Sequence, residues 1–238
     1  MKAIIALGNK AQNGKDSVAQ FAQEILSANG IDSSVVRWSD ELYEEVKNRK
    51  REQPLIMREK SVRGNVFYLL DTNTDQYKVF LENDFPALTH LFNERKIEEY
   101  WGMDEKDSPI LQIWGTDFRR RYFGADYWLK KGVDEIVHRF FKVPEQVILI
   151  PDTRFKNELE AVIKLGGSYV NVVRLNEDGS RYIDDGRDPN HRSETELDDV
   201  EARVIVAKSG DMEGLKNETE NILKLLGLIQ VRSQRVVV

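Results

Sequence analysis

Short apolar runs and helical stripes alternate along the chain in the pattern of a parallel α/β protein. Each apolar run is long enough for one strand, and the stretches between runs repeat apolar residues with the period of a helix. Strands and helices that alternate in this way pair into a parallel sheet with helices on both faces. We predict a three-layer α/β/α fold with a mainly parallel five-stranded sheet, its strands at residues 3–7, 34–38, 145–150, 169–173 and 202–207.

A polar loop ending in Gly14-Lys15 separates the first apolar run from the first helical stripe. One face of the predicted helix is formed by Val18, Phe21, Ala22, Ile25 and Leu26. Strand, Gly-Lys loop and helix in this order are the setting of a phosphate-binding loop, or P-loop. Loop N–H groups and the helix N-terminus attract phosphate, Gly14 allows its close approach, and Lys15 can reach the β- and γ-phosphates.

The loop departs from the common pattern G-x-x-x-x-G-K-[ST] in two ways. Five residues separate Gly8 from Gly14 where the pattern has four, and Asp16 stands where a hydroxyl residue is expected. The hydroxyl of the next residue is the candidate Mg²⁺ ligand. A plain strand-turn-helix with a surface lysine is the alternative. We assign nucleotide binding to Gly8, Asn13, Gly14, Lys15, Asp16 and Ser17.

The second strand ends in Arg37-Trp38. In an open parallel sheet, the carboxyl ends of the strands face the ligand crevice. We therefore expect Arg37 to contact a phosphate and Trp38 to lie beside a base. The alternative for each is an ordinary residue at a strand end.

Residues 39–107 form the stretch that the pattern explains least, and we predict that they are an inserted substrate-binding region. Within it, apolar runs at 66–70 and 77–81 flank the turn-forming sequence D-T-N-T-D-Q. They predict a β-hairpin or two short apolar segments around a turn. Farther on, Ser108-Pro109 predicts a helix start, and residues 114–117 interrupt the helical pattern before three consecutive arginines, 119–121.

The strand predicted at 145–150 runs into the sequence P-D-T-R. A carboxylate at the end of an apolar strand can orient substrate or hold Mg²⁺ in a nucleotide-binding sheet, which makes Asp152 a candidate for both roles. Arg154 can make a bidentate phosphate contact. The alternative is that Asp152 or Thr153 caps the following helix.

A polar, arginine-rich loop from Arg174 to Arg192 is predicted to be a mobile lid or a disordered segment. Arginines that a closing lid brings to a transferring phosphate offset its charge, so Arg181 and Arg192 are candidate catalytic residues. Arg187 lies in the same loop, and Ser193-x-x-Glu196 predicts a capping box at its end.

Composition narrows the class of protein. The net charge of −6 and the lack of a basic tract give DNA binding no electrostatic support. No cysteine is present, which excludes disulfides and Cys-based metal sites, and the three histidines are far apart in the sequence. No run approaches a membrane span or a signal peptide, so we expect a soluble, cytoplasmic protein that binds neither membrane nor nucleic acid.

Several strings, taken together, resemble the deoxynucleoside monophosphate kinases of tailed phages. They are G-K-D-S at 14–17, W-G-T-D-F at 114–118 with Y-W at 127–128, V-I-L-I-P-D-T-R-F-K-N-E at 147–158, and the later V-V-R and H-R-S-E-T-E-L. The resemblance covers the first thirty residues and about 110–226, while residues 52–102 match nothing in it.

The resemblance implies a P-loop kinase that moves the γ-phosphoryl group of ATP to a deoxynucleoside monophosphate with Mg²⁺. We expect one kinase domain over 1–230, in which the resemblance implies a lid at about 174–194. The tail at 231–238 is expected to fray, to add an edge strand or to join an oligomer contact, such as that of a homodimer. Lys15 and Asp16 would act with the lid arginines at the phosphates, and Ser17 with Asp152 at the metal. The acceptor site would comprise Arg37, Trp38, Gly115, Thr116, Asp117, Trp128, Asp152 and Arg154, with Trp128 beside the base.

Two other functions fit the same loop. One is a different small-substrate P-loop kinase, with a sugar, a mevalonate-type phosphate or a cofactor precursor as acceptor. The other is a P-loop ATPase module that is not a kinase. Base preference is not readable from the sequence, and a phage-encoded enzyme would work in the host cytoplasm.

Overall fold

Two compact units make up the computed structural model, which describes residues 2–8, 10–48, 50–62, 64–184 and 188–230. Unit 1 contains the described residues of 2–38, 129–184 and 189–230, and unit 2 those of 39–128 together with Asp188. Arg187 and the tail at 231–238, both named above, lie outside the described residues, as does residue 9 of the loop after the first strand.

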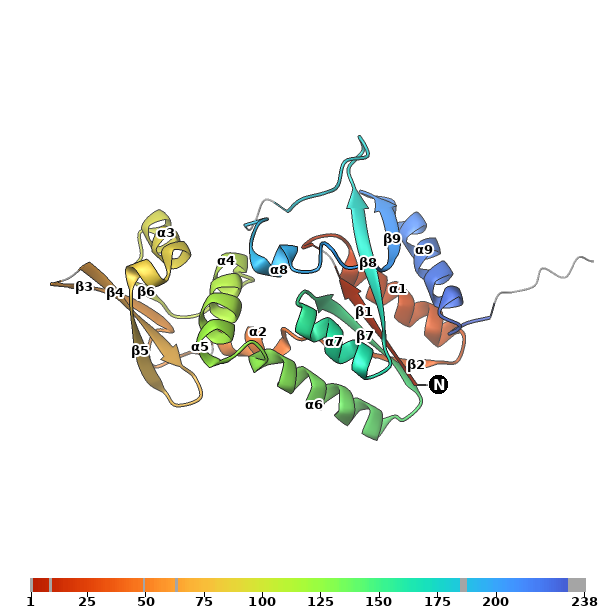
Figure 1. Ribbon diagram of the computed structural model, residues 1–238, viewed down its shortest axis with the longest axis horizontal. Coiled ribbons are helices and arrows are strands. Elements are labelled where there is room, and N and C mark those ends of the chain that lie inside the picture. Colours follow the sequence, from red (N-terminus) through yellow and green to blue (C-terminus); the bar gives the residue numbers. More distant parts are fainter. Residues whose placement is uncertain (1, 9, 49, 63, 185–187, 231–238) are drawn as a thin grey trace, which may run out of the picture. The chain divides into compact units, whose positions relative to one another are not determined.

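Five parallel strands form the sheet of unit 1, in the order β2-β7-β1-β8-β9 (Figure 1). The fold class predicted from the alternating pattern is therefore confirmed. The second strand is shorter than predicted, so Arg37 and Trp38 follow it. The strands are β1 (Ala3–Gly8), β2 (Asp32–Val35), β7 (Gln146–Thr153), β8 (Ser168–Leu175) and β9 (Arg203–Lys208).

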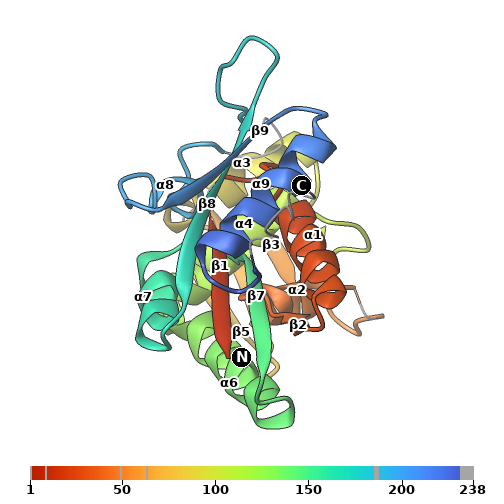
Figure 2. The same cartoon turned by 90° about the vertical axis from the view of Figure 1, so that its right-hand side faces the viewer.

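Helices cover both faces of this sheet. Successive residues of β1 point to opposite faces, so Ile5 and Leu7 join one buried apolar cluster while Ile4 and Ala6 join another. Figure 2 shows α1 and α9 on one side of the sheet and α6 and α7 on the other. The helices of this unit are α1 (Lys15–Ala28), α6 (Tyr127–Lys142), α7 (Lys156–Lys164), α8 (Arg192–Thr195) and α9 (Met212–Leu225), the first residues of α6 belonging to unit 2.

Unit 2 contains an antiparallel sheet in the order β5-β4-β3-β6. Its strands are β3 (Ile56–Ser61), β4 (Gly64–Asp71), β5 (Gln76–Leu81) and β6 (Glu99–Tyr100). Strands β4 and β5 form the predicted hairpin, closed by the pair Asp71–Gln76. Helices α2 (Asp40–Val46), α3 (Pro86–Arg95), α4 (Ser108–Gln112) and α5 (Arg121–Phe123) complete the unit, with a 3₁₀ turn at Glu82–Asp84.

A π-helix (Ile113–Arg120) joins α4 to α5, and it contains residues 114–117, where the helical pattern of the sequence is interrupted. The backbone stays helical there because the wider turn accommodates the segment, and π-turns are frequent at functional sites. Two predicted caps differ from the observed ones. Because Pro109 has no N–H, the carboxylate of Asp107 caps α4 by accepting from Ile110 N at 3.3 Å. At α8, the Nδ1 of His191 accepts from Ser193 N at 3.2 Å.

Over the residues that the structure describes, no helix has both the length and the apolar character needed to cross a membrane.

Candidate functional site

The loop between β1 and α1, of which residues 10–14 are described, is called the phosphate loop below. Gly14 lies in the left-handed region at φ +90°, which a residue without Cβ adopts at no steric cost. Lys15, the first residue of α1, keeps only 6% of its surface exposed, so it is not a surface lysine. Its ammonium group donates to the Lys10 carbonyl of the same loop.

Burial lowers the pKa of Lys15 well below its ordinary value, and the nearby Arg154 guanidinium lowers it as well. The carboxylates of Glu194, Asp16 and Asp152 act in the opposite direction and raise it. A buried ammonium beside a second cation is stabilised by added negative charge. The arrangement around Lys15 therefore favours an anionic ligand.

Packing requires a glycine at position 8, at the end of β1. A Cβ at this position would lie 1.9 Å from the hydroxyl and 2.3 Å from two carbons of the Tyr169 ring. The ring of Tyr169 thus occupies the space that any larger residue would need. The sequence suggested only a phosphate-loop role for this glycine.

The end of β7 carries an irregularity next to the phosphate loop. Ala6 pairs with Ile150 and Gly8 pairs with Thr153, so three steps along β7 match two along β1. The extra residue falls at Pro151-Asp152, where Pro cannot donate to the ladder. Bulges of this kind redirect side chains near active sites.

Trp38 connects the end of β2 to this irregular segment. Its backbone N–H donates to Asp152 Oδ1 at 3.1 Å, and its indole Nε1 donates to Thr153 Oγ1 at 3.2 Å. The indole is buried, and it fills the space where a Cβ of Gly132 in α6 would lie. The structure therefore brings Trp38 and Asp152 together and places the indole in the core.

Arg37 and Asp16 also come together, with 2.9 Å between the guanidinium and the carboxylate. Both side chains are more than a third exposed, so this ion pair contributes little to stability. It does place Arg37 beside the first turn of α1.

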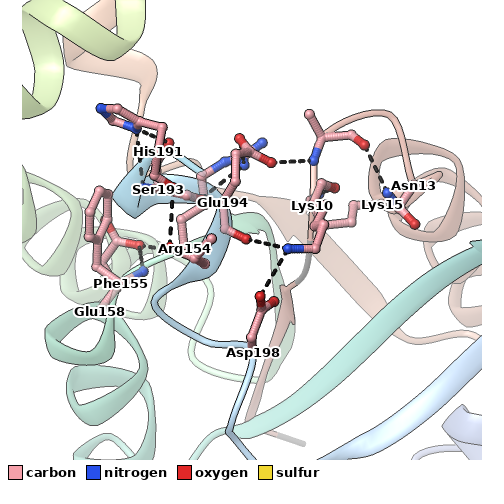
Figure 3. A network of polar contacts seen from close by, with 12 residues as sticks. Lys10, Asn13, Lys15, Arg154, Phe155, Glu158, His191, Ser193, Glu194 and Asp198 are labelled. Atoms are coloured by element: carbon pink, nitrogen blue, oxygen red, sulfur yellow. Dashed lines mark hydrogen bonds and ion pairs between the residues drawn. The ribbon is translucent and has the colours of Figure 1, made fainter. Parts of the chain in front are cut away.

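Glu194 of α8 joins the phosphate loop to Arg154 (Figure 3). One carboxylate oxygen accepts from Ala11 N at 2.8 Å, and the other pairs with the Arg154 guanidinium at 2.6 Å. The sequence reasoning missed Glu194. Its one signal was a carboxylate within the string H-R-S-E-T-E-L, and 183 positions separate it from Ala11.

The start of the predicted lid is attached to the same loop. Arg174 N donates to Asn13 Oδ1 at 2.8 Å, and the Asn13 amide donates to the Ala11 carbonyl at 2.8 Å. Farther along, Arg181 forms a β-bridge with Leu175, and residues 185–187 lie outside the described chain. At its end, Arg192 pairs with Glu196, the residue that follows α8, and the Arg192 guanidinium carbon lies 5.8 Å from the centroid of the Phe155 ring.

Four of the residues expected to bind the acceptor belong to unit 2: Gly115, Thr116, Asp117 and Trp128. Trp128 is buried and donates from its indole to the Gly115 carbonyl at 3.0 Å. A Cβ on Gly115 would lie 2.8 Å from a methyl group of Leu42. Thr116 and Asp117 are half-buried on the same π-helix.

The three consecutive arginines have structural partners. Arg119 has no exposed surface and pairs with Glu45 at 2.8 Å and Asp71 at 2.9 Å. Arg120 donates to the Ala125 carbonyl at 2.6 Å, and Arg121 donates to the Asp84 carbonyl at 3.1 Å. Arg119 is therefore a buried structural cation.

Two comparisons with known proteins bear on this site. A family model described as deoxynucleotide monophosphate kinase matches residues 40–219. A curated protein of Enterobacteria phage T4, named deoxynucleotide monophosphate kinase, is 27% identical over 142 residues. That alignment covers 60% of this chain and 53% of the T4 protein, so the chain spans about half the length of this relative.

Proposed function

The chain belongs to the deoxynucleotide monophosphate kinase family, and from this premise we propose that it transfers the γ-phosphoryl group of ATP to a deoxynucleoside monophosphate. The observation that carries the proposal is the buried Lys15 at the end of the phosphate loop, beside Arg154. In-line phosphoryl transfer needs positioning and charge stabilisation, and it needs no covalent nucleophile from the protein.

The phosphate loop and α1 would hold the ATP phosphates. Backbone N–H groups at the start of α1 would donate to the phosphates, and the helix dipole favours negative charge at that end. Lys15 supplies an ammonium group, and because this group is buried, water does not compete with the phosphate for it. Arg154 supplies a second cation, whose planar fork suits phosphate oxygens. Arg37, held by Asp16, is a further phosphate contact.

The donor set fits Mg²⁺, the metal that kinases of this kind use. Ser17 offers a hydroxyl and Asp152 a carboxylate, and Mg²⁺ prefers such hard oxygen ligands. Among the described residues, no group of three or more His, Asp or Glu side chains could hold a metal alone. Mg²⁺ in kinases is usually bound by one or two protein ligands together with substrate phosphates. When bound, the ion would neutralise charge on the phosphates.

Residues of unit 2 would bind the acceptor nucleotide. Trp128 and Gly115 are held together by the indole hydrogen bond, which fixes the π-helix on which Thr116 and Asp117 lie. An aromatic side chain beside such a segment is suited to a base, and hydroxyl and carboxylate groups are suited to sugar and phosphate recognition. Because the T4 relative is a phage protein, we expect the enzyme to work in the host cytoplasm.

Coupled ADP-release kinetics test the function. The protein is supplied with ATP, Mg²⁺ and, in turn, dAMP, dGMP, dCMP, dTMP and the four ribonucleotides. We expect ADP to form only with nucleoside monophosphates, at rates that depend on the base. ADP formation with sugars or phosphorylated cofactor precursors would favour the other small-substrate kinases. ATP turnover stimulated by DNA and unaffected by any monophosphate would favour an ATPase module.

A further inference from the structure

Glu194 lies on a short helix, yet its carboxylate is as buried as a core residue. Its relative exposure is 6%, and both of its oxygens have charged or backbone donors as partners. A buried carboxylate with poor partners destabilises the fold, so it is retained where both oxygens accept good hydrogen bonds. The partners of Glu194 are therefore informative about its role.

The first partner is the phosphate loop. Ala11 is buried, and its N–H donates to a Glu194 oxygen at 2.8 Å. Lys10 completes a reciprocal attachment, since its ammonium donates to the Glu194 carbonyl at 2.9 Å and to Asp198 Oδ2 at 3.0 Å. Helix α8 and the turn after it thus bind two successive residues of the loop, Lys10 and Ala11 (Figure 3).

The second partner is the Arg154 guanidinium, at 2.6 Å from the other oxygen. Arg154 also donates to the Ser193 carbonyl at 3.3 Å, so its guanidinium binds two successive residues of α8. Arg154 and Lys15 are close enough to repel each other, and the carboxylate of Glu194 acts on Lys15 in the opposite sense. One carboxylate therefore offsets the repulsion between two cations that face the same site.

This attachment also restricts the conformations of a long loop. With five residues between Gly8 and Gly14, the loop is one residue longer than the common pattern. A longer loop has more conformations to lose when it orders around a phosphate. Attachment from α8 at Lys10 and Ala11, and from β8 at Asn13, removes that freedom before the ligand arrives.

We propose that Glu194 is a positioning residue for ATP, which holds the phosphate loop through Ala11 and the guanidinium of Arg154 at the same time. The inference rests on the proposed kinase function, because it deepens the role of the same nucleotide site. Glu194 itself is not expected to touch the phosphates. It acts through groups that do.

Glu194→Gln is the direct test. The amide oxygen can still accept from Ala11, but the NH₂ group would face the Arg154 guanidinium donor to donor. The matched control is Asp199→Asn, which removes the same charge from an exposed pair with Lys156 just beyond α8. Titration calorimetry with ATP and Mg²⁺, without an acceptor, measures binding, and steady-state kinetics give KM for ATP and kcat.

We expect Glu194→Gln to weaken ATP binding roughly tenfold or more, with a matching rise in KM for ATP, as loss of a charged hydrogen bond predicts. Asp199→Asn should bind ATP like the wild type. ATP affinity equal to that of the wild type, even with a lower thermal midpoint, overturns the proposal, because a purely structural carboxylate would give that result. Tighter ATP binding also overturns it, since the carboxylate would then compete with phosphate.

Two further measurements keep the test decisive. If Glu194→Gln does not fold, Glu194→Asp keeps the charge with a side chain too short for both partners, and wild-type ATP affinity in that variant overturns the proposal. In a double-mutant cycle with Arg154→Gln, the Glu194 effect should shrink, whereas full additivity overturns the link to Arg154. If the wild type binds ATP but transfers no phosphoryl group, the proposed function fails while calorimetry still decides on Glu194.

Discussion

The Arg119 guanidinium lies 2.9 Å from the Asp71 carboxylate inside unit 2, where Arg119 has no exposed surface. The same guanidinium binds Glu45 at 2.8 Å and the Thr72 hydroxyl at 2.6 Å. Glu45 in turn accepts from the Tyr127 hydroxyl at 2.7 Å. The π-helix that bears Arg119 is thereby fixed to α2 and to the end of β4.

Replacement of Arg119 by Met should destabilise the protein strongly. Two buried carboxylates, Glu45 and Asp71, would lose their counter-ion, and breaking a buried pair from one side costs about 3–5 kcal/mol. Arg121→Met is the control, because Arg121 is exposed and donates to a single carbonyl. Urea denaturation followed by circular dichroism measures both. Equal midpoints for the two variants would contradict the structural role of Arg119.

Acid should weaken the Arg119–Asp71 pair over a defined range of pH. Burial raises the pKa of Asp71, but hydrogen bonds from Arg119 and the Asn73 N–H outweigh it and hold the pKa below its ordinary value. The unfolded state then binds this proton more readily, so the contribution is fully present above about pH 4 and is lost as pH falls through the folded-state pKa.

Asp71→Asn provides the comparison for this acid effect. The difference in thermal midpoint between wild type and variant should be constant near neutrality and should shrink below pH 4. A difference that stays constant down to the lowest pH at which both proteins fold would show that Asp71 is not held ionised by its partners.

Lys15→Met should abolish most of the kinase activity while the fold survives. Loss of one preorganised charge at a transferring group lowers the rate by roughly 10²–10³-fold. The Met side chain fills similar volume without the cost of burying an ammonium, so the thermal midpoint should stay level or rise. Coupled ADP release and a thermal melt check the two parts. Turnover near that of the wild type would refute the assigned role of Lys15.

Gly8→Ala should lower stability because the added methyl group meets the Tyr169 ring. Overpacking of this kind costs about 1–3 kcal/mol when the neighbour is held in a core. Tyr169→Leu introduced together with Gly8→Ala should recover part of that loss, since the smaller side chain vacates the space. Thermal melts of both single variants and the double variant give the interaction. Strict additivity would show that the two positions do not clash.

The sheet and the loop between β1 and α1 could be predicted from local patterns in the sequence. Five apolar runs alternate with helical stripes. Strands of this kind are buried on both faces when they form a parallel sheet between two layers of helices. Gly14 and Lys15 are local features as well, since loop and helix follow each other directly in the chain. The hairpin β4–β5 followed from alternation around a polar turn for the same reason.

The partners of the charged side chains depend on how the chain folds. Glu194 and Ala11 are far apart in the sequence, and no spacing rule connects them until β7, β1 and α8 are in place. The sequence does not show which of the three consecutive arginines is buried. In the folded chain, Arg119 pairs with Glu45 and Asp71. Periodicity along a chain records which faces are apolar. The partner of a buried charge depends on contacts between distant segments, and these exist only once the chain has folded.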